Sequence, residues 1–187
     1  MNATPRISKS WVLLLSVALA SASFVGCAGP TQPVSASSDL PTDVNEYIPA
    51  EAGGRAVGAA STLGASLTEA LPGVEEIALG EIASSGGQQV DVPAAFIAAI
   101  NSAENVEGLR EALLMLGSDG ASVETQELAG VEVEYYDLPI GGDDVGLNVV
   151  LEFLVVDASR MVMVMSFEGK ELADSLMTAA IEKAKAS

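Results

Sequence analysis

The sequence contains no histidine and a single cysteine, and both scarcities restrict its chemistry. Nucleophilic catalysis by Ser-His-Asp or Cys-His groups needs an imidazole and is excluded. Zinc, haem and iron–sulfur sites built from Cys and His are excluded for the same reason. Because the one cysteine, Cys27, lies near the N-terminus, we expect no disulfide and no cofactor in the folded part of the chain.

Basic and aromatic residues are also scarce. The 8 basic residues face 26 acidic ones, which gives a net charge of −18, and a surface of that sign repels nucleic acid. We therefore expect no nucleic-acid partner. Aromatics make up only 4% of the chain and the one tryptophan, Trp11, lies close to the N-terminus, which disfavours a carbohydrate site and predicts an aliphatic core.

The first 26 residues have the pattern of an export signal. Arg6 and Lys9 precede an apolar run that starts at Trp11, and small residues follow up to Gly26. The apolar run is too short and too rich in serine for a membrane-spanning helix, which needs roughly 20 apolar residues.

The signal ends in Phe24-Val25-Gly26-Cys27, which resembles the lipobox of bacterial lipoproteins. The resemblance covers residues 1–27. It implies cleavage after Gly26 and a diacylglycerol on the sulfur of Cys27, which becomes the new N-terminus. Two or three acyl chains give stable anchoring where one is marginal. The resemblance thus places the protein in the bacterial cell envelope, membrane-anchored by lipid and facing outside the cytoplasm.

The remaining chain divides into a tether and a domain. After the signal peptide (1–26), residues 27–50 are rich in Pro, Ser, Thr and Ala and are predicted to be a disordered lipid-proximal tether. Residues 51–187 are predicted to form a single acidic domain. Its second half resembles uncharacterised secreted lipoproteins of high-GC bacteria in its pattern of hydrophobicity and turns, a likeness that implies no activity.

Apolar periodicity and turn residues predict an α+β fold, with an antiparallel β-sheet of about five to six strands and two to three packed helices. Asn101, followed by Glu104, is expected to cap the second helix, which Gly117 closes. The expected helices cover residues 55–70, 101–117 and 170–184, and the expected strands cover 75–83, 90–100, 122–128, 130–138, 147–156 and 161–167.

Few residues suggest a chemical site. Ser166 and Lys170 lack the SxxK spacing of a Ser–Lys pair. Asp137, Asp143 and Asp144 flank a Gly-rich turn and offer oxygen ligands for calcium, but no D-x-D-x-D-G loop is present, so a solvated hairpin turn is the favoured interpretation. Met161, Met163 and Met165 share one strand face, where methionine suits either an adaptable binding surface or ordinary core packing.

Three functions follow as hypotheses. The leading one is a lipid-anchored extracytoplasmic protein whose domain is a non-catalytic binding or structural module with an envelope protein as partner. The first alternative is a carrier of a lipid or other apolar molecule, held in a sheet–helix cavity lined by Phe153, Leu154 and Met163. The second is a hydrolase that uses paired carboxylates, for which the 26 acidic residues leave room.

Overall fold

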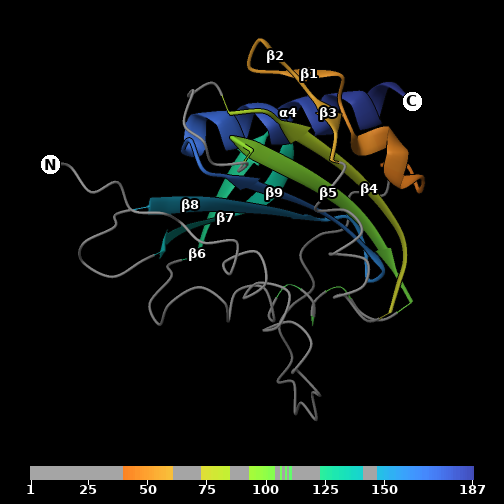
Figure 1. Cartoon of the computed structure of the whole chain (residues 1–187). Coiled ribbons are helices and arrows are strands. Elements are labelled where there is room, and N and C mark those ends of the chain that lie inside the picture. Colours follow the sequence, from red (N-terminus) through yellow and green to blue (C-terminus); the bar gives the residue numbers. More distant parts are fainter. Residues whose placement is uncertain are drawn as a thin grey trace, which may run out of the picture.

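A computed structural model describes residues 40–60, 73–84, 93–103, 106, 108, 110, 123–140 and 147–187. These residues form an antiparallel β-sheet with the helix α4 (Lys170–Ala186) across one of its faces, so the predicted α+β class is confirmed (Figure 1). The larger sheet has seven strands rather than five to six, and α4 is the one α-helix whose ends lie within the described residues.

The strands form two sheets, one of seven strands and one of two. The order in the larger sheet is β3-β4-β5-β9-β8-β7-β6, and every neighbouring pair is antiparallel. All six predicted strands are present, and β1 to β3 are additional. The bounds are β1 (Glu51–Ala52), β2 (Arg55–Ala56), β3 (Gly58–Ala59), β4 (Val74–Ile82), β5 (Ala95–Ser102), β6 (Val123–Leu128), β7 (Val131–Ile140), β8 (Leu147–Val155) and β9 (Arg160–Ser166).

The central strands β8 and β9 are buried on both faces, as their apolar sequences predict. Because successive residues of a strand point to opposite faces, β8 contributes Val150 and Leu154 to the core beneath α4. Its intervening residues Leu151 and Phe153 belong to a second apolar cluster on the other face, with Met163 of β9.

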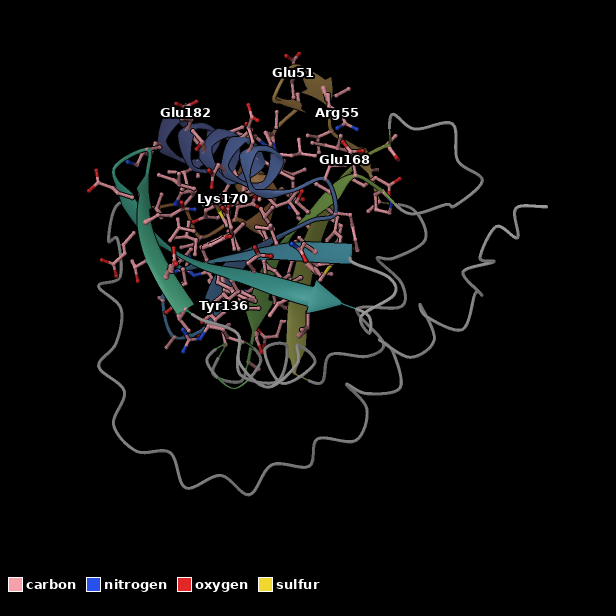
Figure 2. All side chains as sticks on the ribbon, turned by 90° about the vertical axis from the view of Figure 1, so that its left-hand side faces the viewer. Glu51, Arg55, Tyr136, Glu168, Lys170 and Glu182 are labelled. Carbon is pink, nitrogen blue, oxygen red and sulfur yellow. The ribbon has the colours of Figure 1, made fainter. Side chains whose placement is uncertain are left out.

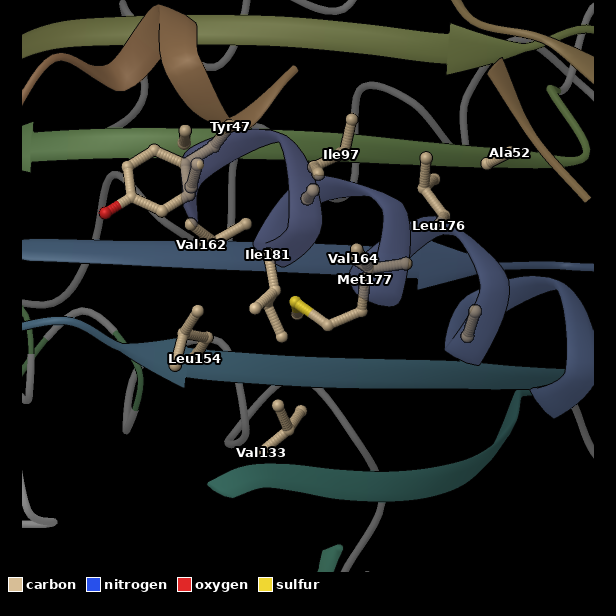
Figure 3. Packing of buried hydrophobic residues seen from close by; sticks show 14 of the residues in the cluster. Tyr47, Ala52, Ile97, Val133, Leu154, Val162, Val164, Leu176, Met177 and Ile181 are labelled. Atoms are coloured by element: carbon tan, nitrogen blue, oxygen red, sulfur yellow. The ribbon is translucent and has the colours of Figure 1, made fainter. Parts of the chain in front are cut away.

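Helix α4 covers the first of these cores. It begins after Gly169, whose φ of 100° lies in the region that favours glycine. Glu171 in its first turn and Lys183 in its last complement the helix dipole. Figure 3 shows its apolar side chains above the aliphatic residues of β5, β9 and β8, among them Leu176, Met177, Ile181, Ile97, Val162, Val164 and Leu154.

The helix predicted for residues 55–70 is wrong in its first part. Residues 55–56 and 58–59 are strands β2 and β3, and residues 61–70 lie outside the described residues. Tertiary packing explains the difference: Val57 lies so close to Gly80 of β4 that a Cβ there would come within 2.6 Å of its Cγ1 atom. The segment thus packs as extended chain where β4 lacks a side chain.

The expected helix start at Asn101 is also wrong. Asn101 is paired with Arg160 in the β5–β9 ladder, and β5 continues to Ser102, so a helix cap cannot form there. Helical residues are found later, at Val106, Gly108 and Arg110, while Glu104 and Gly117 lie outside the described residues.

The folded domain begins before residue 51, within the segment assigned to the tether. A short 3₁₀ helix, η1 (Val44–Tyr47), packs on α4, and Leu40, Val44 and Tyr47 are buried in the core. Lys183 of α4 donates to the backbone oxygens of Asn45 and Ile48 at 2.7 and 2.9 Å. Residues 40–50 are therefore part of the domain.

Candidate functional site

The predicted lipidation residue, Cys27, lies outside the described residues, as does the whole of 1–39. Asp143 and Asp144 of the acidic turn also lie outside them, and Asp137 is an exposed residue of β7. Within the described part of the chain, no three Cys, His, Asp or Glu residues come together in a way that would hold a metal ion.

The most unusual side chain of the described residues is Glu152, in the middle of β8. Its neighbours on this face of the strand are Val150 and Leu154, so the pleat directs its carboxyl into the core beneath α4. Glu152 is 0% exposed. A carboxylate buried to this degree is costly unless other groups hydrogen-bond to it or it takes up a proton.

Two other elements supply polar groups to this carboxyl. Gln126 of the edge strand β6 donates from Nε2 to Glu152 Oε1 at 2.9 Å and to Asp174 Oδ1 of α4 at 2.9 Å. Because one nitrogen bonds to both, Glu152 Oε1 and Asp174 Oδ1 lie no further apart than the sum of these two distances. Glu152 Oε2 has no hydrogen-bond partner among the described residues.

Lys170 supplies the positive charge of this group. Its Nζ donates to both carboxylate oxygens of Asp174, at 2.7 and 2.8 Å, and to Gln126 Oε1. It also lies 4.8 Å from the ring centre of Tyr135, the β7 residue directly opposite Glu152. We call Gln126, Glu152, Lys170 and Asp174 the carboxyl cluster; it joins β6, β8 and α4.

The two carboxyls titrate in opposite directions. Burial raises the pKa of Glu152 to about 9, and the neighbouring negative charge of Asp174 adds to the effect. Burial also acts on Asp174, but its interaction with Glu152 and its hydrogen bonds from Lys170 and Gln126 outweigh it and lower the pKa of Asp174. These shifts favour the protonated form of Glu152 and the charged form of Asp174.

An open depression lies beside the carboxyl cluster, between α4 and β1. It has a volume of about 420 Å³ and is lined by Glu51, Ala52, Gly53, Asp174, Ser175, Thr178, Ala179 and Glu182. Figure 2 shows Glu51 and Glu182 at this helix-bearing side of the molecule. Three of its lining residues are acidic, two carry hydroxyls and none is basic.

These positions disfavour a carboxylate hydrolase built on Glu152 and Asp174. Both carboxyls of a glycosidase must reach the scissile bond, on either side of it. Asp174 is partly exposed, at 33% of its side chain, but Glu152 has no exposed surface. The cluster links α4 to the sheet, and its buried Glu152 offers no surface to a substrate.

The carrier cavity expected between sheet and helices is not formed by the three residues proposed for it. Leu154 faces α4, whereas Phe153 and Met163 face the opposite side of the sheet. Met161 and Met165 accompany Met163 in that second cluster, and all three methionines are buried, which favours core packing. Successive residues such as Phe153 and Leu154 cannot line one cavity from a regular strand.

Ser166 and Lys170 also do not form a pair in the sense of a nucleophile and its base. Lys170 is engaged with Asp174 and Gln126. The Oγ of Ser166 is fully buried and has no hydrogen-bond partner in the part of the chain that the structure describes.

Sequence reasoning missed the carboxyl cluster, although one signal was present. Glu152 is the only ionisable residue in Val149-Val150-Leu151-Glu152-Phe153-Leu154, a stretch that is otherwise apolar on both faces of its strand.

No protein-family model, curated protein or solved structure matches the chain. None of the helices in the described ranges has the length and apolar character needed to cross a membrane.

Proposed function

We propose that this chain is an exported, lipid-anchored protein of the bacterial envelope whose acidic domain is a non-catalytic binding module. The observation that carries the proposal is the tetrapeptide Phe24-Val25-Gly26-Cys27 at the end of a signal-like leader. The lone cysteine supports it, because a free thiol is a liability in an oxidising compartment and an acylated one is not.

The length of chain between Cys27 and the folded domain limits how far the domain can lie from its anchor. Residues 28–39 separate Cys27 from Leu40, the first buried residue described. Twelve residues span at most about 40 Å when fully extended. The proposed anchor therefore keeps the acidic domain within that distance of the lipid surface, where it meets other envelope proteins.

The binding part of the proposal concerns the depression beside α4. Small-molecule pockets are mostly enclosed and apolar, whereas this one is open and acidic. Its carboxylates and hydroxyls suit a protein partner that presents Lys or Arg side chains. The exposed residues Glu51 and Glu182 contribute charge there without belonging to the core.

The anchor is tested by mass spectrometry of the N-terminal peptide from native envelopes. We expect a peptide that begins at Cys27 and carries a thioether-linked diacylglycerol, and we expect Cys27→Ala to lose the lipid and leave the membrane fraction. An unmodified thiol, or a mature N-terminus beyond residue 27, would refute the proposal.

The binding surface is tested with a photo-crosslinking amino acid at Thr178, which lines the depression, and a control at Glu124 on the edge strand β6. In intact envelopes we expect a protein adduct from position 178 only. The double variant Glu51→Gln, Glu182→Gln should weaken it, whereas Glu171→Gln, an exposed acid of α4 outside the depression, should leave it unchanged. Equal adducts from positions 178 and 124, or none, would contradict this assignment.

A further inference from the structure

The carboxyl cluster contains an acceptor without a donor. Glu152 Oε1 accepts from Gln126, but Oε2 is buried and no donor among the described residues reaches it. Leaving a buried charged oxygen without a hydrogen bond is expensive. A proton on Oε2 neutralises Glu152 and turns Oε2 from an acceptor that lacks a donor into a donor itself.

The orientation of Gln126 agrees with this arrangement. Its amide donates to the two carboxyls, and its carbonyl accepts from Lys170. One lysine faces two carboxyls, so the cluster is neutral only when one carboxyl is protonated. Lys170 bonds to Asp174, which leaves the proton for Glu152.

We propose that Glu152 and Asp174 share one proton, and that this proton is a pH-sensitive latch that joins Gln126 of the edge strand β6 and the first turns of α4 to Glu152 of β8. Gln126 is the only described residue that hydrogen-bonds to both carboxyls, so losing the proton strains the contacts of β6 and α4 together. Above the pH at which Glu152 ionises, two carboxylates lie beside one lysine, the start of α4 separates from β8, and the edge strand β6 is held by its ladder with β7 alone.

Among the groups that surround it, Glu152 is the residue whose charge changes with pH. Val164 and the hydroxyl of Ser166, on β9, carry no charge, and neither does the phenol of Tyr135 at neutral pH. Burial, followed by the charges of Asp137 and Glu124, raises the pKa of Tyr135, so its phenol stays neutral between pH 5 and pH 9. The groups that face the pair from the elements packed against it are Lys170 and Asp174 from α4, Gln126 and Glu124 from β6, Tyr135 and Asp137 from β7, and Ser166 from β9.

The first test compares unfolding equilibria of the wild type and Glu152→Gln between pH 5 and 9. Glutamine keeps an oxygen that accepts from Gln126 and places N–H donors on the other terminal atom, without a titrating proton. The ordinary pKa of a glutamic acid is 4.5, and in the folded protein that of Glu152 is raised to about 9. The wild type is therefore most favoured below pH 4.5, and its folding constant should fall relative to the variant as pH rises, approaching tenfold per pH unit. Glu124→Gln, an exposed acid on β6, is the matched control and should show no such trend.

Two further measurements test the proton and the latch separately. Infrared spectra at pH 7 should contain the C=O stretch of a buried protonated carboxyl in the wild type and Glu124→Gln but not in Glu152→Gln. Asp174→Asn should retain that band at pH 5 and lose it at a lower pH than the wild type. Hydrogen exchange above pH 9, corrected for intrinsic rates, should show loss of protection first in residues 123–128 and 170–174.

The proposal fails if the ratio of folding constants is flat across this pH range, or if no protonated carboxyl is present at pH 7. It also fails if protection is lost uniformly over the sheet, because the proton would then stabilise the whole fold rather than hold these two elements.

Discussion

The two halves of α4 are held on the sheet in different ways. Residues 170–175 bury only Ala173 and lie over the carboxyl cluster, whereas the later turns bury an apolar stripe. That stripe packs on aliphatic side chains of the sheet (Figure 3). Its members are Leu176, Met177, Ala180, Ile181 and Ala184.

The two ends of α4 therefore differ in how far their attachment to the sheet depends on pH. Apolar burial is non-directional and does not depend on pH, so the later turns of α4 hold under any solvent condition that permits folding. The hydrogen bonds of the first turns have fixed directions and depend on the charge of Glu152. One helix is thus anchored at one end and releasable at the other.

The largest effect is expected at the apolar end. Ile181→Ala removes a fully buried side chain from the core and should lower the free energy of unfolding by about 2–5 kcal/mol. The loss should be the same at pH 5 and pH 8, measured by chemical denaturation. Glu182→Ala, at the exposed neighbouring position, is the control and should change stability by less than ~0.5 kcal/mol. A loss that varies with pH would show that the two ends are not independent.

A smaller effect of opposite sign is expected at the polar end. Glu152→Met replaces the buried carboxyl with an apolar side chain of similar length and should stabilise the protein by about 1–3 kcal/mol at pH 8. The raised pKa of Glu152 means that its contribution to stability is present below pH 4.5 and is lost as pH rises toward 9, so the gain should shrink at pH 5. Denaturation at the two pH values measures it, and an equal gain at both would contradict the assigned proton.

Local patterns predicted the sheet but not the N-terminal part of the fold. The alternation of Val131, Val133 and Tyr135 against their neighbours placed β7 correctly, and the turn at Ala129-Gly130 joins β6 to β7 with both residues at positive φ. Residues 55–59 were assigned to a helix because their extended conformation depends on contact with Gly80, which is distant in the sequence. Burial of residues 40–50 likewise depends on α4.

The carboxyl cluster was beyond prediction for a related reason. An isolated acid at Glu152 could be recognised within its apolar strand, but its partners could not. Gln126 is 26 residues from Glu152 and 48 from Asp174, and their meeting is fixed by the order of strands in the sheet and by the placement of α4. Even the opposed faces of Phe153 and Leu154, which the alternation of a strand requires, contradict the shared cavity inferred from the sequence.

Two buried serines differ in their hydrogen bonding, and removing each hydroxyl should change stability by about 1 kcal/mol in opposite directions. Ser166, beside the carboxyl cluster, has no partner for its Oγ among the described residues, whereas Ser102 donates to the backbone oxygen of Gly73 at 3.1 Å. Removing an unsatisfied hydroxyl should stabilise, so Ser166→Ala should gain about 1 kcal/mol, and Ser102→Ala should lose about the same. Thermal and chemical unfolding measure both. A loss in Ser166→Ala would show that its hydroxyl has a partner, such as a bound water.

The smallest effect is expected at Lys170, whose side chain is 39% exposed. Lys170→Met removes an i,i+4 ion pair with Asp174, which contributes about 0.3–0.5 kcal/mol, and an exposed cation–π contact with Tyr135, which contributes about 0.5 kcal/mol. We expect a loss of at most ~1 kcal/mol that diminishes as salt is added, measured by denaturation at low and high ionic strength. Lys185→Met is the control, because Lys185 bonds to a backbone oxygen at Ala129 and should respond less to salt. A loss of several kcal/mol would mean that the charge of Lys170, rather than the proton on Glu152, holds the first turns of α4.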